Sequence, residues 1–150
     1  MNEFKFSVVI AAYNSDLWIS KTINSLINQT IDFEKNIQKW WLRGEKMMKL
    51  VFICSGNTSR SPMAEGLFRK MVGNVDVSSA GFSTQSGENA DEYACLVCRK
   101  HGIDLSDFKT TNISDVDFNG VDLVLAATVE NREKIKRFYP NINAHTIKEY

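Results

Sequence analysis

Apolar residues along the chain fall into short continuous runs that alternate with longer stretches of helical periodicity. The runs at residues 6–13, 51–53, 75–78, 121–127 and 144–147 predict strands. Apolar positions spaced three or four apart predict helices over residues 19–28, 61–73, 88–101 and 129–138. Strands that alternate with helices predict an α/β fold, with a four-stranded parallel sheet over residues 48–150 that carries helices on both faces. An extra βα unit precedes this sheet in the chain.

The loop after the strand at residues 51–53 carries the candidate chemistry. It consists of Cys54, Ser55, Gly56, Asn57, Thr58, Ser59 and Arg60, and a Ser-Pro pair at 61–62 then begins a helix. A loop of small residues at a helix N-terminus directs backbone N–H groups at a phosphate, so residues 55–59 are expected to form the cradle. A thiolate is stabilised in such a place, and a guanidinium can contact two phosphate oxygens at once. The sequence therefore predicts attack by Cys54 on phosphorus, with Arg60 as the phosphate clamp.

A lone cysteine after an apolar strand is more often a small buried residue. Here Arg60, six positions on, and the glycine between them favour the phosphate site. The segment from Cys54 to Glu65 (CSGNTSRSPMAE) resembles the signature of the low-molecular-weight protein tyrosine phosphatases, a family that includes bacterial protein arginine phosphatases. The resemblance continues through Ser79-Ala80-Gly81 and residues 101–104 and 121–125, and it covers about residues 48–150. It implies a flavodoxin-like winding, a cysteinyl-phosphate intermediate and no cofactor.

The same resemblance implies supporting roles for polar residues around the loop. Asn57, Ser61, Ser79 and His101 are expected to hydrogen-bond one another and to hold the loop, and Ser61 is expected to stabilise the thiolate. By itself, His101 also fits a solvent-facing residue at a helix end. The resemblance also bears on the substrate, because arginine phosphatases of the family have a threonine at the position of Thr58, where tyrosine-directed members usually have a larger aliphatic residue. The stretch from Phe82 to Ser86 lacks the aromatic wall expected to sandwich a phenol ring, and both features favour phosphoarginine over phosphotyrosine. The expected partners are a phosphorylated protein and inorganic phosphate or other oxyanions.

In this family the general acid is an aspartate in an Asp-Pro loop, which a last helix follows. The chain ends at Tyr150 before either, so we expect this phosphatase domain to lack both and its activity to be impaired. Asp115, Asp117 and Asp122 do not match the position of the acid. The alternative is a non-catalytic phosphate-binding or interaction module.

Residues 6–33 resemble the first βα unit of the family 2 glycosyltransferases. The acidic nucleotide-binding and metal-binding motifs of that family do not follow, and one βα unit cannot form a sugar-nucleotide site. We therefore expect residues 1–33 to be a glycosyltransferase-like fragment and residues 34–47 to be a linker.

Composition and charge exclude some classes of partner. Lys and Arg number 18, as do Asp and Glu, so no basic surface for nucleic acid is expected. No apolar run approaches the roughly 20 residues that span a bilayer, so no membrane contact is expected. The three cysteines are an odd number in a chain with no recognisable secretory signal, which predicts a reducing, cytoplasmic location. Cys95 and Cys98 form a Cys-x-x-Cys that could be a redox pair or half of a zinc site. They lie inside a predicted helix without a second cysteine pair, and ordinary thiols are the favoured interpretation.

Overall fold

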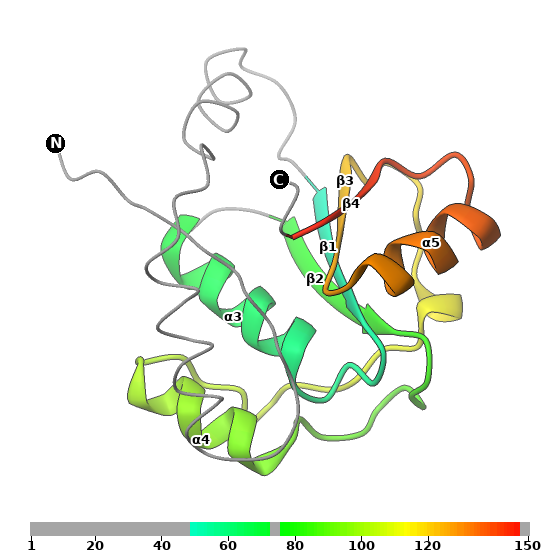
Figure 1. The fold of residues 1–150 in the computed structure, drawn as a ribbon. Coiled ribbons are helices and arrows are strands. Elements are labelled where there is room, and N and C mark those ends of the chain that lie inside the picture. The colour runs from blue at the N-terminus through cyan, green and yellow to red at the C-terminus, as the bar shows by residue number, and fades with distance from the viewer. Residues whose placement is uncertain (1–48, 73–75, 148–150) are drawn as a thin grey trace, which may run out of the picture.

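The computed structural model describes residues 49–72 and 76–147 (Figure 1). Its elements, in chain order, are β1 (Lys49–Cys54), α3 (Arg60–Val72), β2 (Asp76–Gly81), α4 (Glu92–Lys100), a 3-10 turn η1 (Ile113–Asp115), β3 (Leu123–Ala126), α5 (Val129–Phe138) and β4 (Ala144–Thr146). The expected βα fragment at 1–33 and the linker at 34–47 lie outside the described residues. No helix among the elements above is long and apolar enough to cross a membrane.

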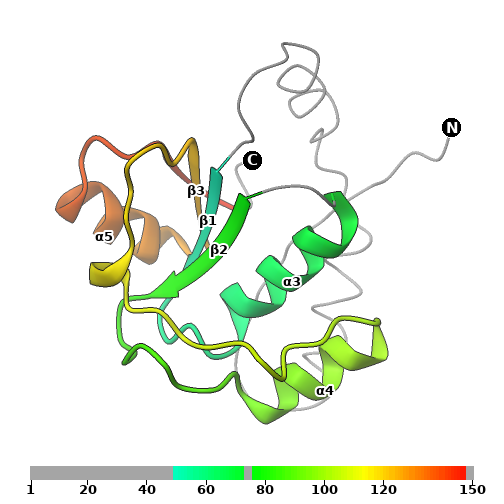
Figure 2. The same cartoon turned by 180° about the vertical axis from the view of Figure 1, so that it is seen from behind.

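The four strands form one parallel sheet in the order β2-β1-β3-β4. Figure 1 and the reverse view in Figure 2 show α3 and α4 on one side of this sheet and α5 on the other. The predicted α/β fold, with a parallel sheet covered on both faces, is confirmed. The chain leaves β1 toward β2 on one side and later reaches β3 on its other side. The loop after β1 therefore lies at a switch in strand order, where open α/β sheets bind ligands.

Side chains of β1 point alternately to the two faces of the sheet and contribute to the core on both. Val51 and Ile53 belong to a buried cluster that includes Ile135 of α5. Phe52 points to the opposite face, where its ring meets the Phe68 ring of α3 edge-on at a centroid distance of 5.8 Å. Since side chains alternate along a strand, the residue two positions after Phe52 leaves the sheet on the α3 side. That residue is Cys54.

α4 packs on α3 through a second buried cluster, which contains Met63, Leu67, Ala94, Val97 and Cys98. Helix α4 terminates just before Gly102, whose φ of 67° is left-handed. The N–H of Gly102 donates to the carbonyl of Arg99, and the N–H of Ile103 donates to that of Cys98. This pair of bonds is a Schellman motif, and it explains why the helix ends where the sequence places a glycine.

Two predicted boundaries differ from the structure by more than two residues. The helix expected from residue 88 begins at Glu92, because Glu88 and Asn89 pair instead with residues 109–110. Asp91 caps the helix by accepting from the N–H groups of Tyr93 and Ala94. The strand expected at 75–78 is β2, which continues to Gly81 because its pairing with β1 extends to Cys54.

Candidate active site

The sulfur of Cys54 lies at the base of the loop between β1 and α3. Cys54 is the last residue of β1, and its side chain is buried. The backbone N–H of Asn57 donates to Cys54 Sγ at 3.2 Å, and Ser61 Oγ lies 3.0 Å from the same atom. Two polar groups therefore contact the sulfur from the loop and from the first turn of α3, an arrangement that stabilises a thiolate.

Asn57 connects this loop to three other segments. Its φ of 48° is left-handed, a conformation that asparagine tolerates better than most residues, and its side chain is fully buried. The amide Nδ2 donates to Ser61 Oγ at 2.8 Å and to Ser79 Oγ at 2.9 Å. Its Oδ1 accepts from the backbone N–H of Thr111 at 2.7 Å. Both amide hydrogens and the carbonyl oxygen are thus engaged, which holds the turn in one conformation.

The carbonyl groups of the loop are bound by the segments that surround it. Ser55 O accepts from Ser83 N at 2.8 Å, and Thr58 O accepts from Asp91 N at 2.7 Å. In a trans peptide the C=O and the following N–H point in opposite directions. The N–H groups of Gly56 and Ser59 therefore point away from those segments. The backbone can present these donors to an anion.

Arg60 closes the loop as the first residue of α3. Its side chain is half-buried, and Nη2 lies 3.5 Å from Ser55 Oγ, a weak contact that places the guanidinium beside the first residue after Cys54. The sulfur, the loop amides and the guanidinium are therefore brought to one place. This constellation suits nucleophilic attack on a phosphoryl group whose other oxygens are held by N–H donors.

Gly81 allows the end of β2 to approach the loop closely. A Cβ at this position would stand 2.7 Å from Asn57 N and 2.8 Å from Ser55 O, both backbone atoms. No side chain fits there without moving the loop. The sequence shows Gly81 after a strand, but the contact that requires glycine is visible only in the fold.

The structure brings Asn57, Ser61 and Ser79 together and does not bring His101 to them. His101 is the C-cap of α4, and within the described residues its imidazole has no hydrogen bond to this group. The N-terminus of α4 is the end near the loop, since Asp91 N bonds to Thr58 O. Nine residues of helix, about 13 Å, separate the two ends of α4. The backbone N–H of Thr111 holds Asn57 instead, and nothing in the local sequence indicates that role.

Two other titratable residues, Asp122 and Cys98, lie away from the loop. Asp122 accepts from the Lys49 N–H at the start of β1, which is the opposite end of that strand from Cys54. Cys98 is buried between α3 and α4, where burial and the neighbouring Cys95 raise its thiol pKa to about 12. In residues 49–72 and 76–147, no group of three or more His, Cys, Asp or Glu side chains could hold a metal ion.

Comparisons with known proteins agree with this geometry. The chain is 35% identical over 92 residues to a Ralstonia solanacearum protein named "Probable low molecular weight protein-tyrosine-phosphatase EpsP", covering 61% of this chain and 63% of EpsP. The chain therefore spans less than two thirds of the length of that relative. A crystal structure of a low molecular weight protein tyrosine phosphatase from T. tengcongensis superposes with a TM-score of 0.62 at 38% identity, covering 68% of this chain and 74% of the other.

The YwlE arginine phosphatase from Geobacillus stearothermophilus is a further structural relative. It superposes with a TM-score of 0.63 at 30% identity, and the match covers 68% of each chain. The sequence model of the family described as "Low molecular weight phosphotyrosine protein phosphatase" matches residues 49–150. This match includes the whole parallel sheet and the loop that holds Cys54 and Arg60, so the chain belongs to the low molecular weight phosphotyrosine protein phosphatase family.

Proposed function

We propose that this chain is a phosphoprotein phosphatase that acts through a cysteinyl-phosphate intermediate. The observation that carries the proposal is the position of Cys54 Sγ, which accepts from the Asn57 N–H at the base of a loop that begins a helix. The positive end of the α3 dipole and the loop amides favour a dianion above the sulfur. Arg60, whose guanidinium lies beside Ser55, supplies a further positive charge.

The reaction has two displacements at phosphorus. Cys54 Sγ forms a bond to phosphorus as the bond to the leaving oxygen or nitrogen breaks, and the leaving atom takes up a proton from solvent. Water then attacks phosphorus and gives up a proton to solvent, the S–P bond breaks, and inorganic phosphate departs as the thiolate returns. The loop amides and Arg60 stabilise the charge on the equatorial oxygens in both steps.

Three features of the entrance support a phosphoarginine substrate over phosphotyrosine. Thr58 Oγ1 lies over Gly56, 3.5 Å from where a Cβ would stand there, so a small polar side chain borders the loop. The residues at 83–86, bonded to the loop through the Ser83 N–H, include no aromatic ring that could sandwich a phenol. The exposed carboxylates of Asp91 and Glu92 lie at the end of α4 nearest the loop and complement a guanidinium.

The first experiment measures release of p-nitrophenol from p-nitrophenyl phosphate by the full chain. The Cys54→Ser and Arg60→Ala variants are each expected to lose at least about 100-fold in kcat/KM, because they remove the nucleophile and the oxyanion clamp. Acid quench of the wild type is expected to trap phosphate on the peptide that contains Cys54. Equal turnover by wild type and Cys54→Ser would contradict the proposal.

The second experiment separates substrates and separates catalysis from binding. Peptides that carry phosphoarginine or phosphotyrosine are compared by phosphate release, and phosphoarginine is expected to have the larger kcat/KM. Vanadate binding is measured in parallel and should be lost in Arg60→Ala. If vanadate binds but neither peptide nor the aryl phosphate turns over, the chain is an oxyanion-binding module and not an enzyme.

A further inference from the structure

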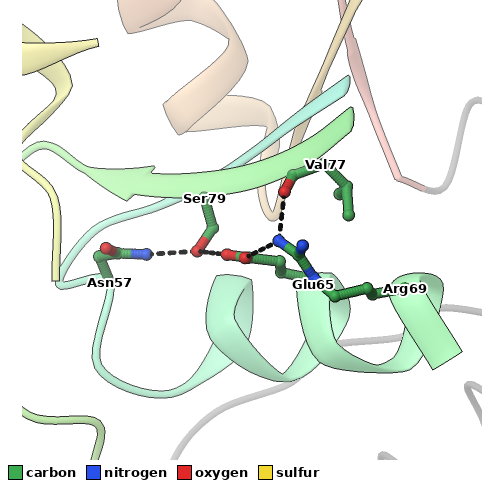
Figure 3. Close-up of polar contacts among 5 residues, drawn as sticks. All are labelled: Asn57, Glu65, Arg69, Val77 and Ser79. Carbon is green, nitrogen blue, oxygen red and sulfur yellow. Dashed lines mark hydrogen bonds and ion pairs between the residues drawn. The ribbon is translucent and has the colours of Figure 1, made fainter. Parts of the chain in front are cut away.

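A chain of hydrogen bonds leads from the sulfur of Cys54 through Ser61, Asn57 and Ser79 to Glu65. Figure 3 shows the part of it that runs from Asn57 through Ser79 and Glu65 to Arg69. Glu65 is on α3, one turn beyond Ser61, and its side chain is 15% exposed. Its Oε2 accepts from Ser79 Oγ at 2.7 Å, and its Oε1 accepts from Arg69 Nη2 at 2.7 Å. The same Arg69 nitrogen donates to Val77 O of β2 at 2.6 Å, so the carboxylate is held between the helix and the strand.

The direction of each bond in this chain is determined by its two ends. A carboxylate can only accept, so the Ser79 hydroxyl must give its hydrogen to Glu65. Ser79 Oγ can then meet the Asn57 amide only as an acceptor, which requires that Nδ2 face it. The backbone N–H of Thr111 donates to Oδ1 of Asn57, so Thr111 and Glu65 hold the amide in the same orientation together.

These bond directions also determine which atom receives the hydroxyl hydrogen of Ser61, the residue in contact with the nucleophile. The second hydrogen of Asn57 Nδ2 goes to Ser61 Oγ at 2.8 Å, so this oxygen is already an acceptor. The hydrogen of Ser61 itself remains for Cys54 Sγ at 3.0 Å, because the other acceptor within reach, Ala80 O, is farther away at 3.4 Å. A hydroxyl that donates to sulfur stabilises the thiolate over the thiol.

We propose that Glu65, held by Arg69, is a positioning residue that orients the hydrogen bonds of Ser79, Asn57 and Ser61 so that a donor faces Cys54 Sγ. The proposal rests on the proposed function, because a thiolate at Cys54 matters only to a chain that uses it. Each carboxylate oxygen of Glu65 accepts one bond from a different donor. A glutamine at this position has one oxygen, so it cannot accept from both Ser79 and Arg69.

The test is the pH dependence of alkylation of Cys54 by iodoacetate, followed by mass spectrometry of the peptide that contains it. In Glu65→Gln the midpoint of this profile is expected to rise by about half a unit to one unit, a fall of about three- to tenfold in rate below the midpoint. In the double variant Glu65→Gln/Arg69→Met, the glutamine oxygen is free to face Ser79. The midpoint is therefore expected to return toward that of the wild type.

Two controls distinguish orientation from loss of charge or stability. Glu130→Gln breaks the Glu130–Lys134 ion pair on α5, which has the same i,i+4 spacing and 2.7 Å length as the Glu65–Arg69 pair. Ile135→Val shortens a fully buried side chain on the other face of the sheet. Both are expected to keep the wild-type midpoint.

A folded Glu65→Gln with the wild-type midpoint overturns the proposal, and so does a double variant displaced as far as the single one. Alkylation needs no turnover. A chain that hydrolyses nothing therefore refutes the proposed function, while the alkylation profile still decides the role of Glu65.

Discussion

The backbone N–H of Asn57 donates to Cys54 Sγ at 3.2 Å, and Asn57 does so from a left-handed conformation with φ of 48°. The conformation turns the loop back over the sulfur after only two intervening residues. The buried Asn57 side chain holds this turn from the other direction, through Ser61, Ser79 and the backbone of Thr111. One residue thus contributes its backbone to the nucleophile and its side chain to the scaffold.

Replacing Asn57 by alanine is expected to lower both stability and turnover. The change leaves the part-buried Thr111 N–H without its acceptor and removes the two bonds from Nδ2, which should reduce the free energy of unfolding by about 2–4 kcal/mol. Asn57→Gly relieves the left-handed strain and should recover about 1 kcal/mol of this loss. Urea unfolding measures both variants. Equal stability of the two would show that the backbone conformation carries no strain.

Gly81→Ala tests the close approach of β2 to the loop. The new Cβ would stand under 3.0 Å from three loop atoms, two of them backbone atoms, so the loop must move at a cost of about 1–3 kcal/mol. Vanadate affinity should fall in parallel, because the loop amides move with the backbone. Gly87→Ala is the control, since it has a positive φ but nothing within 4 Å of the added carbon. It should lose stability without losing vanadate affinity, and equal losses of affinity in the two variants would argue against a specific contact.

Thr58→Ile is expected to shift substrate preference toward phosphotyrosine. Thr58 is half-buried at the edge of the loop, and isoleucine keeps the β-branched shape while it replaces a hydroxyl with apolar surface. We expect the ratio of kcat/KM for phosphotyrosine over phosphoarginine peptides to rise about tenfold, which corresponds to about 1.4 kcal/mol. Phosphate release from both peptides gives the ratio. No change in it would place the determinant of specificity elsewhere.

Cys98 is expected to make stability fall with rising pH above about 9. Burial and the neighbouring Cys95 raise the pKa of this thiol from 9.0 to about 12, so above pH 9 the unfolded chain binds fewer protons than the folded one. The contribution of Cys98 is complete below pH 9 and is lost as the pH rises toward 12, with a limiting slope of about 1.4 kcal/mol per pH unit. Urea unfolding between pH 8 and 10.5 measures it. Cys98→Ala should lose less stability over this range, whereas parallel curves would rule out Cys98 as the source.

The strand, loop and helix around Cys54 follow from local sequence. Three apolar β-formers precede the loop, a Ser-Pro pair begins α3, and both signals act within a few residues. The alternation of strands and helices also predicts the parallel sheet, because parallel strands need crossovers of this kind. The predicted start of α4 is wrong because long-range pairing outweighs local helix propensity there. Residues 88–89 pair with residues 109–110 and do not extend the helix.

The residues that hold the loop depended on the fold. Asn57 and Ser79 are 22 positions apart, and Asn57 and Thr111 are 54 apart, so no local pattern records either contact. His101 shows the converse, since it follows the helix that starts beside the loop but lies at the opposite end of it. The sequence by itself determined which groups can do chemistry at phosphorus, because nucleophile, amides and guanidinium are contiguous in the chain. Only the tertiary structure decided which distant groups orient them, because a hydrogen bond depends on where its partners lie in space and not on their separation in sequence.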